Sequence, residues 1–275
     1  MKRNILVVVI FVVGIFSWAN FSMASGKNAK TVVFPVTETR SVSYWKPSLK
    51  MKWQIQFAGV LDQRANAEVF VVDGFDTDVK TVKALHAKGK KVVCYFSAGS
   101  LENWRPDAKK FPKVVIGKKL SGWAGENWLD IRNLKVLGPI MKARIDMCKQ
   151  KGFDGVDIDN VNGYTNVTGF SLTGNDQLRY NRFLADAAHA RGLAVGLTND
   201  IDQITALVGS FDFEINEQCF VYNECSKLKP FIQAGKPVFN IEYVKNKNVC
   251  AKANVLNFNT LFKNQNLDAW SQACR

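Results

Sequence analysis

The sequence predicts an α/β protein built as a single (β/α)8 TIM barrel that follows a cleaved signal peptide. Stretches with helical periodicity alternate with short apolar strands, a pattern typical of parallel sheets. Residues 25–275 also have the length of eight strand–helix units, about 250 residues. In four places a helix-like stretch ends in a glycine just before an apolar strand: Gly89, Gly152, Gly192 and Gly235. Glycine readily adopts the left-handed conformation that commonly ends a helix.

The first residues have the pattern of a secretory signal. Lys2 and Arg3 precede an apolar run, Ile5 to Phe16, and small residues then form a cleavage site. The apolar run is too short to span a membrane comfortably, so we expect cleavage and no membrane anchor in the mature protein. We therefore expect a secreted or periplasmic protein, and a monomer. The predicted organisation is a signal peptide at 1–24, an extended lead-in at 25–49 and the barrel domain at 50–275.

Eight short apolar segments are predicted to be the barrel strands. In chain order they are Trp53–Phe57, Val69–Asp73, Val92–Ser97, Trp128–Ile131, Gly155–Asn160, Leu193–Asn199, Phe211–Glu217 and Val238–Tyr243. The clearest helices are Leu134–Lys151 and Asp176–Ala190, and the second has an apolar stripe on one side. No Gly-x-Gly-x-x-Gly opens the first unit, which argues against a dinucleotide-binding sheet.

The chain is strongly basic, with a formal net charge of +13. A basic balance raises the expectation of an anionic partner. Here, however, the lysines are scattered singly and do not concentrate on one helix. We expect a solvated surface and no nucleic-acid partner.

The six cysteines of a predicted exported chain indicate disulfides. Two pairs are plausible from their positions: Cys219 with Cys225, and Cys250 with Cys274. Cys94, in an apolar strand, and Cys148, in a helix, could each equally be a buried free thiol. The sequence has no Cys-x-x-Cys or Cys/His cluster, so we expect no zinc site.

Both histidines are expected to be structural. His86 and His189 each lie in the last turn of a helix, just before a capping glycine. In that place a histidine meets the negative end of the helix dipole, at the barrel face opposite the expected site. Serine–histidine and cysteine–histidine catalysis would therefore lack a base.

Carboxylates at the strand ends are the best candidates for catalysis. Asp157 and Asp159 are two residues apart on the predicted fifth strand, so both should point into the barrel. Glu217 ends the seventh strand and Glu242 the eighth. Two carboxyl groups that face each other, one ionised and one protonated, are what glycosidic bond cleavage requires. Four acids at strand ends on the same rim therefore favour a catalytic role over a salt bridge or a helix cap.

Other residues expected at the same rim are candidates for binding sugar hydroxyls, amines or ring faces. They are Asp73, Tyr95, Trp104, Glu126, Asp157, Asn199, Glu242 and Tyr243, with Trp123, Trp128 and Tyr164 as further aromatic candidates.

Several motifs, in order, resemble glycoside hydrolase family 114. They are Cys94–Ser100 with Glu102 and Trp104–Asp107, then Trp123–Arg132, Lys151–Asn160 and Asn216–Cys219. The resemblance runs from about Trp53 to Tyr243, nearly the whole mature chain. It implies a TIM barrel with endo-α-1,4-polygalactosaminidase activity and no cofactor. It also implies that Asp159 and Glu217 are the family's catalytic aspartate and glutamate.

One position departs from the family pattern. Where the family commonly has Glu-Pro-Asp-Asn, this chain has Asp157-Ile158-Asp159-Asn160. The implied substrate is an amino-sugar polysaccharide, which is cationic when its amines are free and would be attracted to an acidic cleft. Asp159 is predicted to attack or stabilise the anomeric carbon, and Glu217 to protonate the leaving oxygen. The reverse assignment, and retention or inversion, stay open.

Two other functions are alternatives to a glycosidase. A non-catalytic carbohydrate-binding barrel would keep the aromatic residues but would not need both Asp159 and Glu217. A metal-dependent polysaccharide deacetylase would need histidine ligands at metal spacing, and both histidines lie at helix ends.

Overall fold

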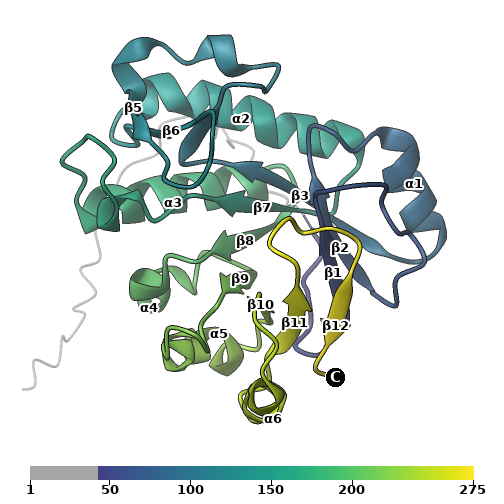
Figure 1. Cartoon of the computed structure of the whole chain (residues 1–275). Helices are drawn as coiled ribbons and strands as arrows, with labels where there is room; N and C mark the ends of the chain where they lie inside the picture. The colour runs from purple at the N-terminus through teal and green to yellow at the C-terminus, as the bar shows by residue number, and fades with distance from the viewer. Residues whose placement is uncertain (1–42) are drawn as a thin grey trace, which may run out of the picture. The chain divides into compact units, whose positions relative to one another are not determined.

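Eight parallel strands form the barrel of this protein in the computed structural model, which describes residues 43–275 (Figure 1). The order around the sheet is β1–β2–β3–β7–β8–β9–β10–β11, and a short antiparallel strand, β12, follows β11. The bounds are β1 (Trp53–Gln56), β2 (Val69–Asp73), β3 (Lys91–Ser97), β7 (Gly155–Asp159), β8 (Ala194–Thr198), β9 (Phe213–Glu217), β10 (Val238–Glu242), β11 (Asn259–Lys263) and β12 (Ser271–Ala273). The predicted TIM barrel is confirmed.

Helices cover the outside of the sheet (Figure 1). They are α1 (Val79–Ala87), α2 (Leu134–Lys151), α3 (Gly174–His189), α4 (Ile204–Leu207), α5 (Lys229–Gln233) and α6 (Lys247–Val255). The bounds predicted for α2 are correct, and those for α3 differ by two residues at the start and one at the end. All four predicted capping glycines have positive φ, between 67° and 91°.

The predicted strand Trp128–Ile131 is not part of the barrel. Its first two residues, Trp128 and Leu129, end β6 (Glu126–Leu129). This strand is the middle one of a separate antiparallel sheet with β4 (Ser100–Glu102) and β5 (Ile116–Lys119). This small sheet is an insertion between β3 and α2. The eighth barrel strand is β11, which sequence reasoning missed. Asp159 therefore ends the fourth barrel strand, not the fifth, and Glu217 the sixth, but they remain two strands apart.

Apolar side chains fill the interior of the barrel below the carboxyl ends of its strands. Val71, Val93, Phe213 and Phe239 belong to one buried cluster within it. Gly196 leaves room for the ring of Phe213, since a β-carbon there would lie 2.2 Å from that ring. Above this filling, the carboxyl ends of the strands are open as a cleft.

Three disulfides link the described chain. Cys219–Cys225 and Cys250–Cys274 are the two predicted pairs. The remaining two cysteines, for which a free thiol was an alternative, form the third disulfide: Cys94 on β3 is bonded to Cys148 on α2. Within residues 43–275, no helix combines the length and apolar character needed to cross a membrane.

The predicted signal peptide lies outside the described residues, as does most of the lead-in. Residues 43–48 carry no regular secondary structure. Tyr44 stacks on His189 with ring centroids 4.7 Å apart, and its hydroxyl donates to Asp212 at 3.4 Å. The start of the described chain thus packs at the amino-terminal end of the barrel.

Candidate active site

A cleft of about 550 Å³ opens at the carboxyl ends of the barrel strands. Six carboxyl groups and two cations are among its lining side chains: Asp73, Glu102, Glu126, Asp157, Asp159 and Glu217, with Arg105 and Lys119. Of the ten site residues predicted from the sequence, nine line this cleft; only Glu242 does not. The strands therefore bring together residues that are up to 170 positions apart in the sequence.

Asp159, the last residue of β7, is held by two donors. The backbone N–H of Asn160 donates to its Oδ1 at 2.6 Å, and the Tyr95 hydroxyl on β3 donates to its Oδ2 at 3.0 Å. Tyr95 is supported by Phe57, whose ring centroid is 4.2 Å away. These contacts fix the carboxyl group at the floor of the cleft.

Glu217, the last residue of β9, is held in a parallel way. The Asn199 side-chain amide donates to its Oε2 at 3.2 Å, and the Tyr243 hydroxyl donates to its Oε1. Each of the two predicted catalytic carboxyl groups thus has one N–H donor and one tyrosine hydroxyl. Such paired donors orient a carboxylate and favour its charged form.

The charges of these two groups act on each other. Burial, and next the negative charge of Glu217, raise the pKa of Asp159 to about 7. The negative charge of Glu217 disfavours a negative charge on Asp159, so Asp159 takes up a proton more readily than an isolated aspartate does. Near neutral pH the Asp159 carboxyl group is therefore partly protonated and partly ionised.

Asp157 lies one layer deeper on β7 and points the same way as Asp159, as predicted. Among residues 43–275, its side chain has one hydrogen-bond partner, the Thr198 hydroxyl, which donates to Oδ1. Burial raises the pKa of Asp157 to about 8, against the lowering effect of Thr198. At neutral pH, Asp157 is therefore mostly protonated and adds little negative charge next to Asp159.

Asp73 at the end of β2 is neutralised by an arginine. Arg105 donates to its two oxygens at 3.1 and 2.6 Å and pairs with Glu102 at 2.7 Å. All three side chains are buried at one side of the cleft. This cluster stiffens the wall of the cleft and contributes one net negative charge.

The small sheet provides the wall that carries Glu126 and the tryptophans. Glu126 and Trp128 lie two apart on β6, so their side chains project to the same face and line the cleft. Trp104 and Trp123 line it too, and are 52% and 59% exposed. Exposed indole rings beside a cleft suit the apolar faces of sugar rings. Tyr164 is not among the lining residues.

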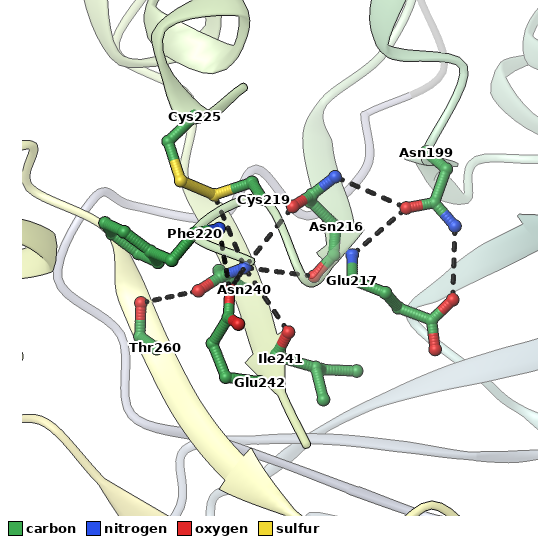
Figure 2. Close-up of a disulfide and its surroundings, with 10 residues drawn as sticks. All are labelled: Asn199, Asn216, Glu217, Cys219, Phe220, Cys225, Asn240, Ile241, Glu242 and Thr260. Atoms are coloured by element: carbon green, nitrogen blue, oxygen red, sulfur yellow. Dashed lines mark hydrogen bonds between the residues drawn. A yellow bond between two sulfur atoms is a disulfide. The ribbon is translucent and has the colours of Figure 1, made fainter. Parts of the chain in front are cut away.

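Glu242 does not lie in the cleft. Ile241 and Tyr243 line it, and because side chains alternate along a strand, Glu242 projects to the other side of β10. It is fully buried there, where it accepts from the backbone N–H of Phe220 at 3.1 Å and from the Asn240 amide at 3.3 Å (Figure 2). The sequence-based placement of Glu242 at the rim is therefore wrong.

A network of amides behind the cleft positions Glu217 (Figure 2). Asn199 accepts from the backbone N–H of Glu217 at 3.0 Å and from the Asn216 amide at 3.3 Å. Asn240, buried on β10, donates to Asn216 at 3.3 Å and accepts from Thr260 on β11 at 2.9 Å. Residues in or next to four neighbouring strands, β8 to β11, are thereby linked to Glu217.

Three residues that follow barrel strands have left-handed backbone conformations. Asn160 follows β7 with φ of 58°, Asn199 follows β8 with 57°, and Gln218 follows β9 with 62°. Such conformations are costly for residues other than glycine and concentrate at functional sites. Here they turn the chain sharply beside Asp159 and Glu217.

Both histidines are structural, as expected. His86 Nε2 lies 2.8 Å from Asp154, and His189 Nε2 lies 2.8 Å from Asp212, at the amino ends of the strands. Among residues 43–275, no three His, Cys, Asp or Glu side chains are grouped to hold a metal ion.

Comparison with known proteins identifies the family. Residues 36–275 match the glycoside-hydrolase family GH114. The chain belongs to this family. It is therefore an O-glycosyl hydrolase with a polysaccharide substrate, which decides against the deacetylase and the non-catalytic barrel.

Solved structures agree with this placement. Ega3 from Aspergillus fumigatus, in complex with galactosamine, is 41% identical, with a TM-score of 0.81 over 86% of this chain and 100% of that one. The glycoside hydrolase domain of PelA from Pseudomonas aeruginosa shares the fold, with 12% identity and a TM-score of 0.65 over 81% of this chain and 98% of its own. An uncharacterized Deinococcus radiodurans protein is 28% identical over 255 residues, 80% of this chain and 82% of its own.

The structure adds residues to this GH114 site that sequence reasoning did not assign. Arg105 and Glu102 are the main ones, and Asn160 supplies both a backbone N–H to Asp159 and a side-chain amide to Ser97 at 2.9 Å. The sequence does hold a local indication for Arg105: it follows Glu102 by three residues, in a polar segment after a barrel strand, where an ion pair between the two can form. Its partner Asp73 is distant in sequence, which hid the pairing.

Proposed function

We propose that this GH114 enzyme hydrolyses α-1,4-linked galactosamine-containing polysaccharide, with Asp159 and Glu217 as its catalytic carboxyl groups. The observation that carries the proposal is that these two groups end barrel strands two apart, share one cleft and each accept from a tyrosine hydroxyl. The similarity to a structure that holds galactosamine supports the choice of sugar.

In the proposed mechanism, Asp159 attacks or stabilises the anomeric carbon while Glu217 donates its proton to the leaving oxygen. If configuration is retained, Glu217 then takes a proton from the water that releases the sugar. The reaction needs one ionised and one protonated carboxyl group. With a pKa of about 7, Asp159 is partly ionised near neutral pH, as an attacking carboxylate must be.

The cleft also suits a cationic polymer. Six carboxyl groups against two cations line it, although the chain as a whole carries +13. Charges inside a cleft with low-dielectric walls act more strongly than scattered surface charges. A polymer of free amino sugars would be attracted into the cleft in spite of the basic surface.

Release of reducing ends from oligogalactosamine tests the proposal. Asp159→Asn and Glu217→Gln should each lower kcat by at least about 100-fold while leaving thermal unfolding unchanged, since general acid–base catalysis alone contributes that much. Matched surface controls are Asp202→Asn and Glu68→Gln. Near-normal turnover by either cleft variant would end the assignment.

The two roles can be separated with an aryl glycoside whose leaving group needs no protonation. Glu217→Gln should still react with it, and added azide should speed its turnover. Asp159→Asn should stay inactive on the same substrate without azide. The opposite pattern would exchange the two roles.

We also propose that the protein is exported. Its three disulfides are typical of an oxidising compartment, and the amino end has the composition of a signal peptide. The mature protein, recovered from the periplasm or medium, should begin near Ser25. An intact amino terminus in a cytoplasmic fraction would contradict this.

A further inference from the structure

Glu242 is a buried carboxyl group that the proposed mechanism does not use. It lies on β10, projects away from the cleft and is 0% exposed. Its Oε1 accepts two hydrogen bonds, from the backbone N–H of Phe220 at 3.1 Å and from the Asn240 amide at 3.3 Å (Figure 2). Its Oε2 has no hydrogen-bond partner among residues 43–275. Burying such a group is costly, and the two contacts of Oε1 are what the fold gains from it.

The first contact holds the main chain directly after Glu217. The backbone N–H that donates to Glu242 belongs to Phe220, three residues further along the chain. Its neighbour Cys219 is joined to Cys225 by a disulfide, which closes the turn of chain between them (Figure 2). The end of β9 that carries Glu217 is therefore attached to β10 just beyond this catalytic candidate.

The second contact leads to the side chain of Glu217. Asn240 has two amide hydrogens, and its nearest acceptors, both at 3.3 Å, are Glu242 Oε1 and Asn216 Oδ1. The Asn216 amide donates to Asn199 Oδ1 at 3.3 Å, and the Asn199 amide donates to Glu217 Oε2 at 3.2 Å. Each of these amides accepts on one side and donates toward Glu217 on the other, so the orientation of one fixes that of the next.

Both connections meet at one atom. Through Phe220, Glu242 Oε1 holds the main chain after Glu217, and through Asn240 it holds the chain of amides that ends on the Glu217 carboxylate. We infer that Glu242 is a positioning residue for Glu217, which it fixes from the outer side of the barrel. The inference rests on the proposed function, in which Glu217 is a catalytic group. A displacement of about 1 Å at a reacting group can lower a rate about 100-fold, so the position of this carboxylate has a direct effect on turnover.

The kinetic test uses two variants of Glu242 and a matched control. Glu242→Leu removes the shared acceptor and should lower kcat on oligogalactosamine by about 10- to 100-fold with little change in KM, because the residues that line the cleft are all kept. Glu242→Gln keeps a carbonyl oxygen in place of Oε1 and should retain most of kcat. Assays are run at a temperature at which thermal unfolding shows every variant to be folded.

Glu214→Leu is the matched control. Glu214 is an equally buried carboxyl group on β9, and within the described chain neither of its oxygens has a hydrogen-bond partner. It takes no part in either connection to Glu217, so Glu214→Leu should keep the wild-type kcat. A normal kcat in Glu242→Leu, or an equal loss in both leucine variants, would overturn the inference.

The disulfides separate positioning from a general loss of stability. Replacing Cys219 and Cys225 by alanine loosens the segment that contains Phe220. Replacing Cys250 and Cys274 by alanine instead loosens the link between α6 and the residue after β12. Both double variants should have a lower urea midpoint, and only the first should have a lower kcat. Equal kcat values for the two would contradict the connection through Phe220.

Crystal structures of the variants give a readout that does not depend on hydrolysis. In Glu242→Leu, the Glu217 carboxylate and the Asn199 amide should shift or occupy more than one conformation, whereas in Glu214→Leu they should keep their wild-type positions. An unmoved Glu217 carboxylate in Glu242→Leu would refute the positioning role even if activity were lower. Normal turnover by Glu217→Gln would instead overturn the proposed function, and the crystal structures would still decide whether Glu242 positions that side chain.

Discussion

Replacing Tyr95 by phenylalanine tests how the protein holds the charge of Asp159. The Tyr95 hydroxyl donates to Asp159 Oδ2 at 3.0 Å, and the ring packs on Phe57. Phenylalanine keeps the ring contact and removes only the donor. A hydrogen bond to a charged group contributes about 1.5–3 kcal/mol, which corresponds to about one to two pH units in the pKa of the acceptor.

The sign of the effect follows from the bond. The hydroxyl stabilises the ionised form and lowers the pKa of Asp159, so its loss must raise a pKa that burial has already brought to about 7. If ionised Asp159 is the reacting form, the acid limb of the profile of kcat/KM against pH moves up by about one to two units. At pH 7, where about half of the wild-type Asp159 is ionised, kcat/KM then falls by about 5- to 50-fold.

The assay is the pH dependence of kcat/KM on oligogalactosamine, with thermal unfolding measured in parallel. Tyr44→Phe is the matched control, because its hydroxyl donates to Asp212 at the opposite end of the barrel. An acid limb that stays in place in Tyr95→Phe, with activity lost only through lower stability, would refute the reasoning.

Three further results are expected. Glu214→Gln should raise the free energy of unfolding more at pH 8 than at pH 5. Within the described part of the chain, neither oxygen of the fully buried Glu214 has a hydrogen-bond partner, and burial raises its pKa. Wild type therefore loses about 1.4 kcal/mol of stability per pH unit between the unfolded and the folded pKa of this group; equal urea midpoint shifts at both pH values would contradict this. Replacing Cys94 and Cys148 together by alanine should lower the free energy of unfolding by about 2–4 kcal/mol, because the bond closes a 54-residue separation; an unchanged urea midpoint would argue against it. Finally, kcat/KM on the cationic oligomer should stay constant or rise slightly with added salt, since the basic surface opposes approach; a steep fall would count against an acidic cleft within a repelling surface.

The parts of the fold that follow from local signals could be predicted from the sequence. Glycine before a strand identified four helix–strand junctions because glycine alone adopts positive φ without strain. The junction before β11 escaped, since Asn257 with φ of 61° takes the place of glycine there. The strand at Trp128 was misassigned because an apolar strand in an inserted sheet has the same composition as one in the barrel.

In the site, too, features with a local sequence signal could be predicted and contacts between distant residues could not. Asp157 and Asp159 were placed correctly because their spacing of two fixes a common face. Glu242 was misplaced because the residue that ends a strand can face either way, and the alternation through Ile241 and Tyr243 turns it outward. The partnership of Asp73 with Arg105 could not be derived, since nothing local to either residue reports a contact across 32 positions.

The barrel closes on itself through side chains where β1 meets the carboxyl-terminal strands. Trp53 Nε1 donates to the Asn259 carbonyl at 2.8 Å, Lys263 Nζ donates to Gln54 Oε1 at 3.1 Å, and Arg275 reaches the Leu49 carbonyl. These partners are more than 200 residues apart, so the circle cannot be completed until almost the entire polypeptide has been synthesised. Closure that depends on contacts so distant in the sequence is slow. A chain that closes slowly stays unfolded for longer, which agrees with the proposed export.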